Sequence, residues 1–333
     1  MSLWRGLQYR HVMRSLVIDE LGPLENLRFV ERHIEVAPKN VRVAVRACGV
    51  NYVDAIIIEG KYQIKPPTPY FPGGEVVGVV SEVGSDVSSH KIGDRVFVPV
   101  GVGGFSDEVV VPANRTIRLS DTLTDGQAAT FMQSYMTGWF ALTRRARVES
   151  DKTILVLGAG GGVGLAAVDI ATALGLRVIA AASSKDKRDL ATSRGAIATI
   201  DSSAEDVKER AKELSGGGVD YLYDPVGGEL GETCLRALGE DGQYIVIGFV
   251  GGIPRLPANQ ILLRNRRVTG VDWGAWVSTH QEQNQAMMIE VFNAIEKGTL
   301  HPVEPTTFSL DNAVDALRAL QSRSVAGKIA LIP

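Results

Sequence analysis

The sequence predicts an α/β protein in which a compact, barrel-like β domain is joined to a doubly wound parallel sheet. Three observations carry this prediction. Short β-rich runs fill the first third of the chain, strands and helices alternate after about residue 150, and a glycine-rich turn joins a buried strand to an amphipathic helix. At 333 residues the chain is long enough for two domains.

The β-rich part begins with a run in which apolar and charged residues alternate. Val41, Val43 and Val45 alternate with Arg42 and Arg46, which is the period of a half-buried strand. Further strands are expected at 75–83, 94–100 and 107–112, each bounded by turn residues. Short strands at this spacing are typical of a small barrel-like domain.

The second part alternates between strand and helix patterns. Residues 126–146 predict a helix, and 153–157 is a continuous apolar run, as in a strand buried on both faces. Apolar residues then recur at helical spacing from Val163 to Leu174. Further strands are expected at 177–182, 219–224, 243–248 and 328–333, and further helices at 186–194, 205–214, 281–297 and 311–320. This alternation predicts a doubly wound parallel sheet.

Composition excludes several classes of protein. Hydrophobic residues are 45% and charged residues 22%, close to the globular average, which excludes disorder, collagen and coiled coil. Lys and Arg total 35 against 38 Asp and Glu, for a net charge of −3. Without a basic patch, neither nucleic acid nor a membrane surface is an expected partner.

The cysteines and the N-terminus indicate a cytoplasmic location. Cys48 and Cys234 are the two cysteines, too few for a disulfide framework, and a reducing compartment is expected. Residues 1–5 lack the apolar core of a signal peptide. The apolar stretch 153–183 contains charges and six glycines, so it is not expected to span a membrane.

The glycine-rich turn follows the strand at 153–157. The spacing GxGxxG fails here because Val163 stands at its last position, whereas GxxGxxG fits Gly158, Gly161 and Gly164. Glycine lets backbone N–H groups approach a diphosphate, and a helix N-terminus adds partial positive charge. We therefore predict dinucleotide binding. The alternatives are a tight connection without ligand or a mononucleotide loop, but the latter lacks the required Lys-Ser/Thr.

The end of the second strand of this part indicates which dinucleotide binds. A preference for NAD places Asp or Glu there, to accept a hydrogen bond from the ribose 2′-hydroxyl. Here the residues are Ser183, Ser184, Lys185, Asp186, Lys187 and Arg188. Hydroxyls and cations favour a 2′-phosphate, and hence NADPH. The alternative is that Ser184 only caps a solvated helix.

Several motifs together resemble a known family. They are GVNYVD at 49–54, PGGEVVGVV at 72–80, GDRV at 93–96, the glycine turn, and DPVGG at 224–228. From about Met13 to Pro333 the chain resembles the zinc-independent quinone oxidoreductase (ζ-crystallin-like) branch of the medium-chain dehydrogenase/reductase superfamily. The resemblance implies a GroES-like catalytic domain at 1–127 and 275–333, with a Rossmann NADP(H)-binding domain at 128–274. Residues 1–12 precede the usual start of the family.

The resemblance also implies that no metal is bound. Asn51 corresponds to a zinc-ligating Cys of the zinc alcohol dehydrogenases, and Gly74 corresponds to a ligating His. Residues 97–115 contain none of the cysteines of their structural zinc lobe. Without a thiolate and an imidazole, zinc-dependent alcohol oxidation is not expected.

The implied activity is hydride transfer from NADPH to a quinone or another α,β-unsaturated carbonyl. An enoyl-thioester or 2-alkenal reductase and a non-catalytic NADPH-binding protein are the alternatives. The resemblance assigns Asn51 and Tyr62 to the acceptor pocket and Trp273 to its border with the nicotinamide, whereas Ile56 replaces an aromatic residue of some relatives. The alternative for Asn51 is a turn-capping amide, and for Tyr62 and Trp273 it is packing. Asp54 is expected to cap a helix.

The cofactor contacts are likewise implied by the resemblance. It assigns to NADPH the residues Thr137, Gly161, Gly162, Val163, Ser183, Lys187, Val226, Gly248, Phe249 and Arg323. Asp201 or Ser202 stands where relatives often have a Tyr near the adenosine. A small electrophilic acceptor is the expected partner, together with a second copy of the chain in a homodimer formed through residues 243–271.

Overall fold

The computed structural model describes residues 12–333, which form two compact units. Unit 1 holds the described residues up to Thr130 together with Pro305–Ser324 and Ile329–Pro333, and unit 2 holds Phe131–Glu304 and Val325–Lys328. Residues 1–11 lie outside the described part, so the expectations for residues 1–5 and 1–12 are not addressed by it, except at Val12.

Unit 1 is built around a mainly antiparallel sheet whose longest strand is β3 (Asn40–Val50). β3 pairs with three neighbours, β4, β6 and β15. The other strands of this sheet are β4 (Val76–Val83), β5 (Arg95–Val98), β6 (Glu108–Pro112), β7 (Ile117–Arg118), β14 (Thr306–Ser309) and β15 (Ile329–Ile332). Strands predicted from the alternation of apolar residues are therefore confirmed in this unit.

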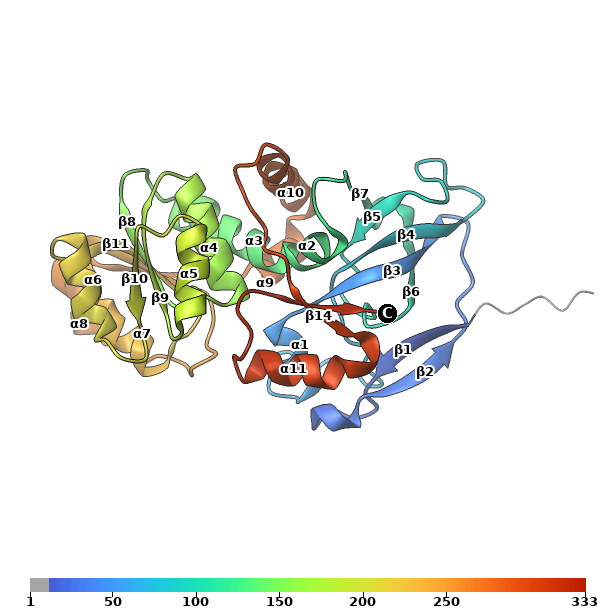
Figure 1. Ribbon diagram of the computed structural model, residues 1–333, viewed down its shortest axis with the longest axis horizontal. Helices are drawn as coiled ribbons and strands as arrows, with labels where there is room; N and C mark the ends of the chain where they lie inside the picture. Colours follow the sequence, from blue (N-terminus) through green and yellow to red (C-terminus); the bar gives the residue numbers. More distant parts are fainter. Residues whose placement is uncertain (1–11) are drawn as a thin grey trace, which may run out of the picture. The chain divides into compact units, whose positions relative to one another are not determined.

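The remaining elements of unit 1 cover this sheet (Figure 1). They are β1 (Met13–Val17), β2 (Arg28–Arg32), α1 (Tyr52–Ile58), α2 (Asp125–Thr130), α11 (Ala313–Gln321) and single turns at Leu24–Asn26, Ala113–Arg115 and Leu310–Asn312. β1 and β2 pair as an antiparallel ribbon. α11 packs against α1, and its Arg318 forms an ion pair with Glu25.

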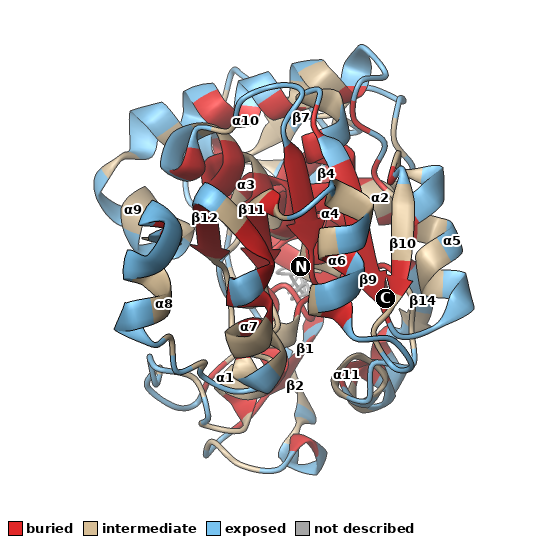
Figure 2. Ribbon diagram, turned by 90° about the vertical axis from the view of Figure 1, so that its left-hand side faces the viewer, coloured by how far each residue is buried: buried red, intermediate tan, exposed pale blue. Residues whose placement is uncertain are grey.

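Unit 2 is a six-stranded parallel sheet. In spatial order its strands are β10 (Ala198–Asp201), β9 (Arg177–Ala182), β8 (Thr153–Val156), β11 (Val219–Asp224), β12 (Leu238–Val246) and β13 (Arg267–Gly270). The sheet interior is buried, as Figure 2 shows for β9, β11 and β12. The strand order reverses between β8 and β11, and in such sheets ligands bind beyond the carboxyl ends of the strands at that point.

The helices of unit 2 pack against this sheet or against one another. They are α3 (Met132–Trp139), α4 (Gly162–Ala173), α5 (Lys185–Ser193), α6 (Val207–Ser215), α7 (Gly228–Cys234), α8 (Ala258–Leu262), α9 (Trp273–Thr279) and α10 (Gln281–Glu296), with short helical turns at Leu235–Ala237 and Leu263–Asn265. The helix predicted over 126–146 is divided into α2, α3 and a π-helical turn at Phe140–Ala146. No helix within residues 12–333 is both long and apolar enough to cross a membrane.

The structure differs from the expected domain division at the second boundary. Residues 275–304, which the resemblance assigned to the catalytic domain, belong to unit 2. The physical reason is that α10 buries an apolar stripe that includes Met287 and Val291, and α3 supplies the surface that covers it. Phe131 and Phe292 meet edge to face with ring centroids 5.0 Å apart. The first boundary falls after Thr130 rather than after residue 127.

Candidate functional site

The glycine-rich turn of unit 2 joins the end of β8 to the start of α4. Gly158 has φ +58°, a left-handed conformation that glycine adopts without strain. A Cβ built on Gly164 would lie 2.2 Å from the Gly158 carbonyl oxygen, so the turn folds back directly onto the first turn of the helix. Gly161 differs, because it is exposed and its Cβ would meet only the Gly158 oxygen, at 3.5 Å.

The start of α4 has the chemistry of an anion site. Gly161 is the N-cap residue and provides no side-chain cap. The N–H groups of the first helical turn have no acceptor within a helix, and they form its positive end. An anion such as a diphosphate satisfies these groups, and the open Cβ position of Gly161 leaves space for it. Gly161, Gly162 and Val163 therefore fit the role that the sequence predicts for them.

Hydroxyls and cations gather where β9 ends. Ser183 is exposed, and Ser184 caps α5 by accepting a hydrogen bond from the Lys187 N–H at 3.5 Å. The stem of Lys187 lies flat against the glycine turn, since a Cβ on Gly160 would be 2.4 Å from the Lys187 Cβ. Ser184 thus caps α5, as its alternative interpretation states, and Lys187 lies beside the glycine turn.

Arg188, which follows Lys187 in the sequence, forms an ion pair with Asp201. The Arg188 Nη1 lies 2.9 Å from the Asp201 Oδ2 and donates to the Ala182 carbonyl at 3.2 Å. Hydrogen bonds from Ser203, followed by the guanidinium of Arg188, lower the pKa of Asp201, so this carboxylate remains charged. Asp201 already neutralises Arg188, and Lys187 is the cation whose side chain lies against the glycine turn.

The loop after β11 is hydrogen-bonded to the loop after β12. The Asp224 Oδ1 accepts hydrogen bonds from the N–H groups of Val226 at 2.7 Å and Gly227 at 2.8 Å. Gly251 in turn donates to the Val226 carbonyl at 2.7 Å. A Cβ on Gly158 would lie 3.0 Å from the Val226 Cγ2. Val226 therefore lies beside the glycine turn, and the loop that holds Gly248 and Phe249 lies beside Val226.

Asp224 is a buried carboxylate whose protonation affects stability. Burial raises its pKa, although hydrogen bonds from Tyr244, Gly227 and Val226 oppose the shift. A carboxyl group with a raised pKa in the folded state favours folding at low pH. This contribution is lost as the pH rises from the ordinary value of an Asp, about 3.9, through the raised one.

We expect Asp224→Asn to remove this pH dependence. The free energy of unfolding of the wild-type protein, relative to the variant, should be greatest near pH 4 and should decrease toward pH 8, in urea titrations at a series of pH values. Asp186→Asn, which changes an exposed carboxylate, is the control. A difference between wild type and Asp224→Asn that stays constant with pH would contradict the assignment.

In unit 1, Asn51 connects β3 to α1 and is 8% exposed. Its backbone N–H donates to the Asp54 Oδ2 at 2.7 Å, and its Nδ2 donates to the Glu75 Oε1 at 2.9 Å. Asn51 and Asp54 therefore form a capping box at the start of α1, which agrees with the capping alternative for Asn51 and the expected capping role of Asp54. An amide nitrogen carries two protons, so one hydrogen bond to Glu75 does not exhaust its capacity to donate.

Cys48 lies in the same buried region. Burial, followed by the negative charges of Asp54 and Glu75, raises the pKa of the Cys48 thiol well above its usual value. This thiol therefore stays protonated at neutral pH, and a protonated thiol is a poor nucleophile. Within residues 12–333, no three His, Cys, Asp or Glu side chains are grouped as a metal ion would require.

The other predicted acceptor residues lie in different units. Tyr62 follows α1, is half-buried, and donates its backbone N–H to the Ile56 carbonyl at 3.1 Å. Ile56 is half-buried on α1, which starts next to Asn51. Trp273 begins α9 in unit 2, and its Nε1 donates to the Asn284 Oδ1 at 3.0 Å. Asn51 therefore precedes α1 directly, and Tyr62 lies in the turn that follows it.

Two predicted cofactor residues lie away from the glycine turn in the sequence. Thr137 is half-buried on α3, and its hydroxyl donates to the Gln133 carbonyl at 2.6 Å. Oxygen lone pairs of this hydroxyl remain able to accept. Arg323 is exposed in unit 1, just after α11, with φ +57°. The chain from Arg323 continues to Gly327, whose N–H donates to the Gly160 carbonyl at 2.9 Å.

The sequence did not predict a buried polar cluster between α3 and α4. The hydroxyl of Tyr135 donates to the Asp169 Oδ2 at 2.7 Å, and the backbone N–H of His301 donates to the same oxygen at 2.6 Å. The His301 Nδ1 lies 3.1 Å from the Asp169 Oδ1. The signal in the sequence was one charged residue, Asp169, within an otherwise uncharged helix. Tyr135 therefore anchors a helix pair within unit 2.

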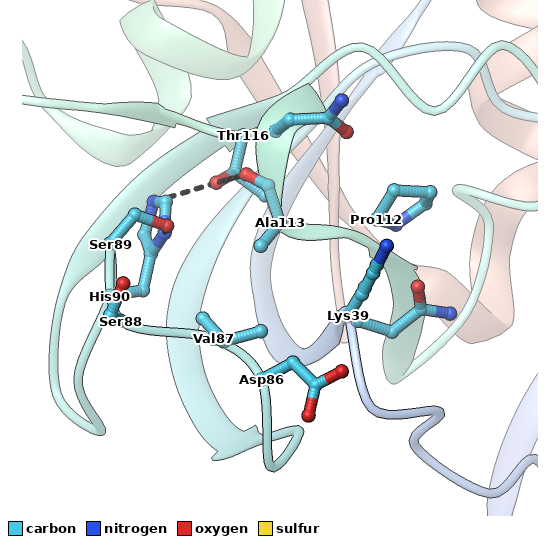
Figure 3. Close-up of a pocket in the computed structure, with 11 residues that line it drawn as sticks. Lys39, Asp86, Val87, Ser88, Ser89, His90, Pro112, Ala113 and Thr116 are labelled. Carbon is cyan, nitrogen blue, oxygen red and sulfur yellow. Dashed lines mark hydrogen bonds between the residues drawn. The ribbon is translucent and has the colours of Figure 1, made fainter.

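A surface hollow in unit 1 has a volume of about 690 Å³ (Figure 3). The Thr116 hydroxyl lies 2.7 Å from the His90 Nε2 at its edge, and burial, followed by the charge of Arg118, lowers the pKa of His90. The hollow includes Asn40, the first residue of β3, whereas Asn51 follows the last. A strand of this length spans about 35 Å, so the hollow is separate from Asn51.

Comparisons with known proteins agree with this architecture. Residues 37–121 match the family model described as "Alcohol dehydrogenase GroES-like domain", and residues 162–293 match "Zinc-binding dehydrogenase". The chain is 35% identical to mouse quinone oxidoreductase-like protein 2, over 98% of this chain and 94% of that protein. These matches confirm the predicted fold class of a GroES-like domain with a Rossmann-type sheet.

Two solved structures are similar over nearly the whole chain. The quinone oxidoreductase of Pseudomonas syringae is 31% identical with a TM-score of 0.85, and it covers 96% of this chain and 100% of its own. The Escherichia coli quinone oxidoreductase complexed with NADPH is 29% identical with a TM-score of 0.84 and the same coverage.

Proposed function

Because this chain belongs to the quinone oxidoreductase family of the medium-chain dehydrogenase/reductase superfamily, we propose that it is a zinc-independent, NADPH-dependent reductase of quinones or other α,β-unsaturated carbonyls. The observation that carries the proposal is the open glycine turn beside Lys187 and Ser183 at the end of β9. The similarity to an NADPH complex of an Escherichia coli quinone oxidoreductase supports the choice of cofactor.

The residues of unit 2 have separate tasks in this proposal. The first-turn N–H groups of α4, with Gly161, Gly162 and Val163, bind the diphosphate. Ser183 and Lys187 bind the 2′-phosphate through charge-assisted hydrogen bonds. Val226, Gly248 and Phe249 border the cofactor, Thr137 holds its nicotinamide end, and Arg323 serves the adenosine phosphate. When bound, NADPH supplies the hydride for the reaction.

The acceptor gains negative charge on its oxygen as it is reduced. We assign the Asn51 Nδ2 and the hydroxyl of Tyr62 to stabilise this charge by donating hydrogen bonds. Trp273 lies at the border between the acceptor and the nicotinamide. Solvent provides the proton that completes the reduction. Since such acceptors are already electron-poor, a strong general acid is not required.

Zinc independence is part of the proposal. It is supported by Asn51 and Gly74 at the positions where the zinc alcohol dehydrogenases have zinc ligands. We therefore expect that a chelator will leave NADPH oxidation unchanged. The two buried free cysteines, Cys48 and Cys234, support a reducing compartment such as the cytoplasm.

The test is NADPH oxidation by the purified protein over graded acceptors: 1,4-benzoquinone, naphthoquinones, 2-alkenals and crotonyl thioesters, with NADH in parallel. Turnover with a quinone or an alkenal supports the proposal. Tight NADPH binding without turnover of any acceptor would instead favour a non-catalytic NADPH-binding protein. If crotonyl thioesters are preferred strongly, the enzyme is an enoyl-thioester reductase.

Tyr62→Phe tests the acceptor assignment. We expect kcat/KM for a quinone to fall by about 100-fold, since removing one donor to a developing oxyanion has effects of this order. The Kd for NADPH should not change. Tyr52→Phe, which removes a phenol hydroxyl from the first residue of α1, is the matched control. Wild-type kcat/KM in Tyr62→Phe would remove Tyr62 from the acceptor site.

We also propose that the protein is a homodimer in which β13 of one copy pairs with β13 of another. β13 is an edge strand of the parallel sheet. Large apolar side chains are exposed on it and just before it, including Leu262 at 78% and Val268 at 40%. An exposed apolar edge strand readily pairs with another chain.

The double variant Leu262→Glu/Val268→Glu should convert the dimer to a monomer, as measured by light scattering after size exclusion. Charges on both copies would face each other across the pairing strands. Ile197→Glu is the control, because Ile197 is 59% exposed and precedes β10, at the opposite edge of the sheet. A double variant that remains dimeric would place the interface elsewhere.

A further inference from the structure

A buried glutamate, Glu75, is hydrogen-bonded to the Asn51 amide, and the chemistry proposed above gives it no task. Glu75 directly precedes β4 and is 1% exposed. Its Oε1 accepts a hydrogen bond from the Asn51 Nδ2 at 2.9 Å. Because taking a carboxyl group out of water costs free energy that its contacts have to offset, a glutamate kept in this place calls for an explanation.

The end of β3 leaves space for the Glu75 side chain. The N–H of Gly49 donates to the Glu75 carbonyl at 3.1 Å, which joins the two backbones. A Cβ on Gly49 would lie 2.7 Å from the Glu75 Oε1 and 2.3 Å from the carbonyl oxygen of Ala129 in α2. The Glu75 carboxyl group therefore lies where a side chain at position 49 would be, and the backbone fixes its place beside Asn51.

The Asn51 amide is held at both of its polar ends. Its side-chain oxygen accepts from the Asp54 backbone N–H in the capping box, and its Nδ2 donates to Glu75. These contacts lie on different atoms of one planar group, so together they fix its rotation. In the flipped orientation the amide oxygen would face the carboxylate, and neither group could donate. Glu75 thus determines on which side of the amide the nitrogen lies.

We propose that Glu75 is a positioning residue that acts through Asn51, fixing the amide so that its nitrogen faces the acceptor oxygen. This inference rests on the proposed function and adds a residue to its acceptor site. A donor that is already oriented needs no reorganisation when negative charge develops on the acceptor. Because that charge appears only as the hydride is transferred, the loss of Glu75 should lower kcat much more than it changes KM.

The test is a double-mutant cycle of Glu75→Met and Asn51→Ala, measured as kcat/KM for 1,4-benzoquinone. Glu75→Met should lower kcat/KM by about 100-fold, the order expected when a group at the reacting centre is misplaced. The Kd for NADPH should not change. In the Asn51→Ala background the same substitution should have no further effect. Losses that multiply in the double variant would show that Glu75 does not act through Asn51 and would overturn the inference.

Two further variants separate positioning from stability. Glu75→Gln should recover most of the activity, because the glutamine oxygen accepts the same hydrogen bond from Asn51. Glu108→Met is the matched control, since Glu108 is a largely buried glutamate of the same sheet that pairs with Arg42 at 3.3 Å. It should lower the melting temperature and leave kcat unchanged. An equal loss of kcat in Glu108→Met would show that the effect follows stability, against the proposal.

The side-chain amide protons of Asn51 provide a measurement that needs neither cofactor nor turnover. In NMR spectra of protein labelled with ¹⁵N-asparagine, they are the pair that Asn51→Ala removes. The proton bonded to Glu75 should resonate downfield of ordinary side-chain amides, and should return toward them in Glu75→Met but much less in Glu75→Gln. Unchanged resonances in Glu75→Met would overturn this inference alone. A wild-type protein that reduces no acceptor would overturn the proposed function, and the positioning role with it.

Discussion

Gly164→Ala should abolish detectable NADPH binding and lower the melting temperature of the protein. A Cβ at this position would lie 2.2 Å from the Gly158 oxygen, 2.8 Å from the Gly158 carbonyl carbon and 3.0 Å from the Ala159 Cα. All three are backbone atoms of the turn, so the turn itself has to move. Overpacking of this kind costs about 3 kcal/mol, and the displaced turn no longer presents its N–H groups to a ligand.

Gly161→Ala separates ligand binding from folding. The Gly161 backbone has φ −91° and ψ 167°, which any residue adopts, and its Cβ would meet only the Gly158 oxygen at 3.5 Å. The melting temperature of this variant should stay within about 2 °C of the wild type. The Kd for NADPH, from fluorescence titration, should nevertheless rise about tenfold because the methyl group occupies ligand space. Wild-type affinity in Gly161→Ala would show that no ligand binds against this turn.

Lys187→Met should reverse the preference of the protein for NADPH. The methionine keeps the aliphatic stem that lies over Gly160 and removes the ammonium group. The loss of a charge-assisted hydrogen bond to the 2′-phosphate raises the Kd for NADPH by about 10- to 100-fold. The Kd for NADH, which lacks this phosphate, should change less than about twofold.

The matched control for this variant is Lys185→Met. Lys185 lies on the same helix, but its side chain is turned to solvent and its Nζ lies 2.5 Å from the Asp189 Oδ2. The ratio of the two Kd values should therefore match that of the wild type. If Lys187→Met weakens NADPH and NADH equally, Lys187 contacts a part that the two cofactors share, and another residue sets the preference.

Much of unit 2 could be predicted from the sequence because its signals are local. The continuous apolar run of β8, the turn glycines and the helical spacing of α4 follow each other within about 20 residues. Strands buried on both faces and amphipathic helices have distinct periods. Neither signal depends on a distant part of the chain.

The short edge strands could not be predicted in the same way. β13 and β14 have burial patterns with three exposed residues in four, so their side chains do not alternate between core and solvent. Each becomes a strand because β12 or β15 offers it hydrogen bonds. The membership of α10 in unit 2 likewise depends on the surface of α3, which periodicity within α10 does not reveal.

Residues near the glycine turn could be predicted where they directly follow a strand of the parallel sheet. Residues that other segments bring to the turn could not be predicted. Lys187 and Val226 come after β9 and β11, so topology alone brings them near the glycine turn. Ser134 lies on the preceding helix and Lys328 near the end of the chain. A Cβ on Gly162 would lie 3.2 Å from the Ser134 Oγ and 2.6 Å from the Lys328 Cδ, and this approach is a consequence of tertiary packing.

The path of the chain near its C-terminus affects how the protein can be dissected. Val325–Lys328 belongs to unit 2, whereas the residues on either side, Pro305–Ser324 and Ile329–Pro333, belong to unit 1. A gene fragment encoding 131–304 would therefore omit Gly327, whose N–H holds the Gly160 carbonyl. Four residues have to be returned to that fragment, by a peptide added in trans or by a circular permutation, before it can stand for the whole of unit 2.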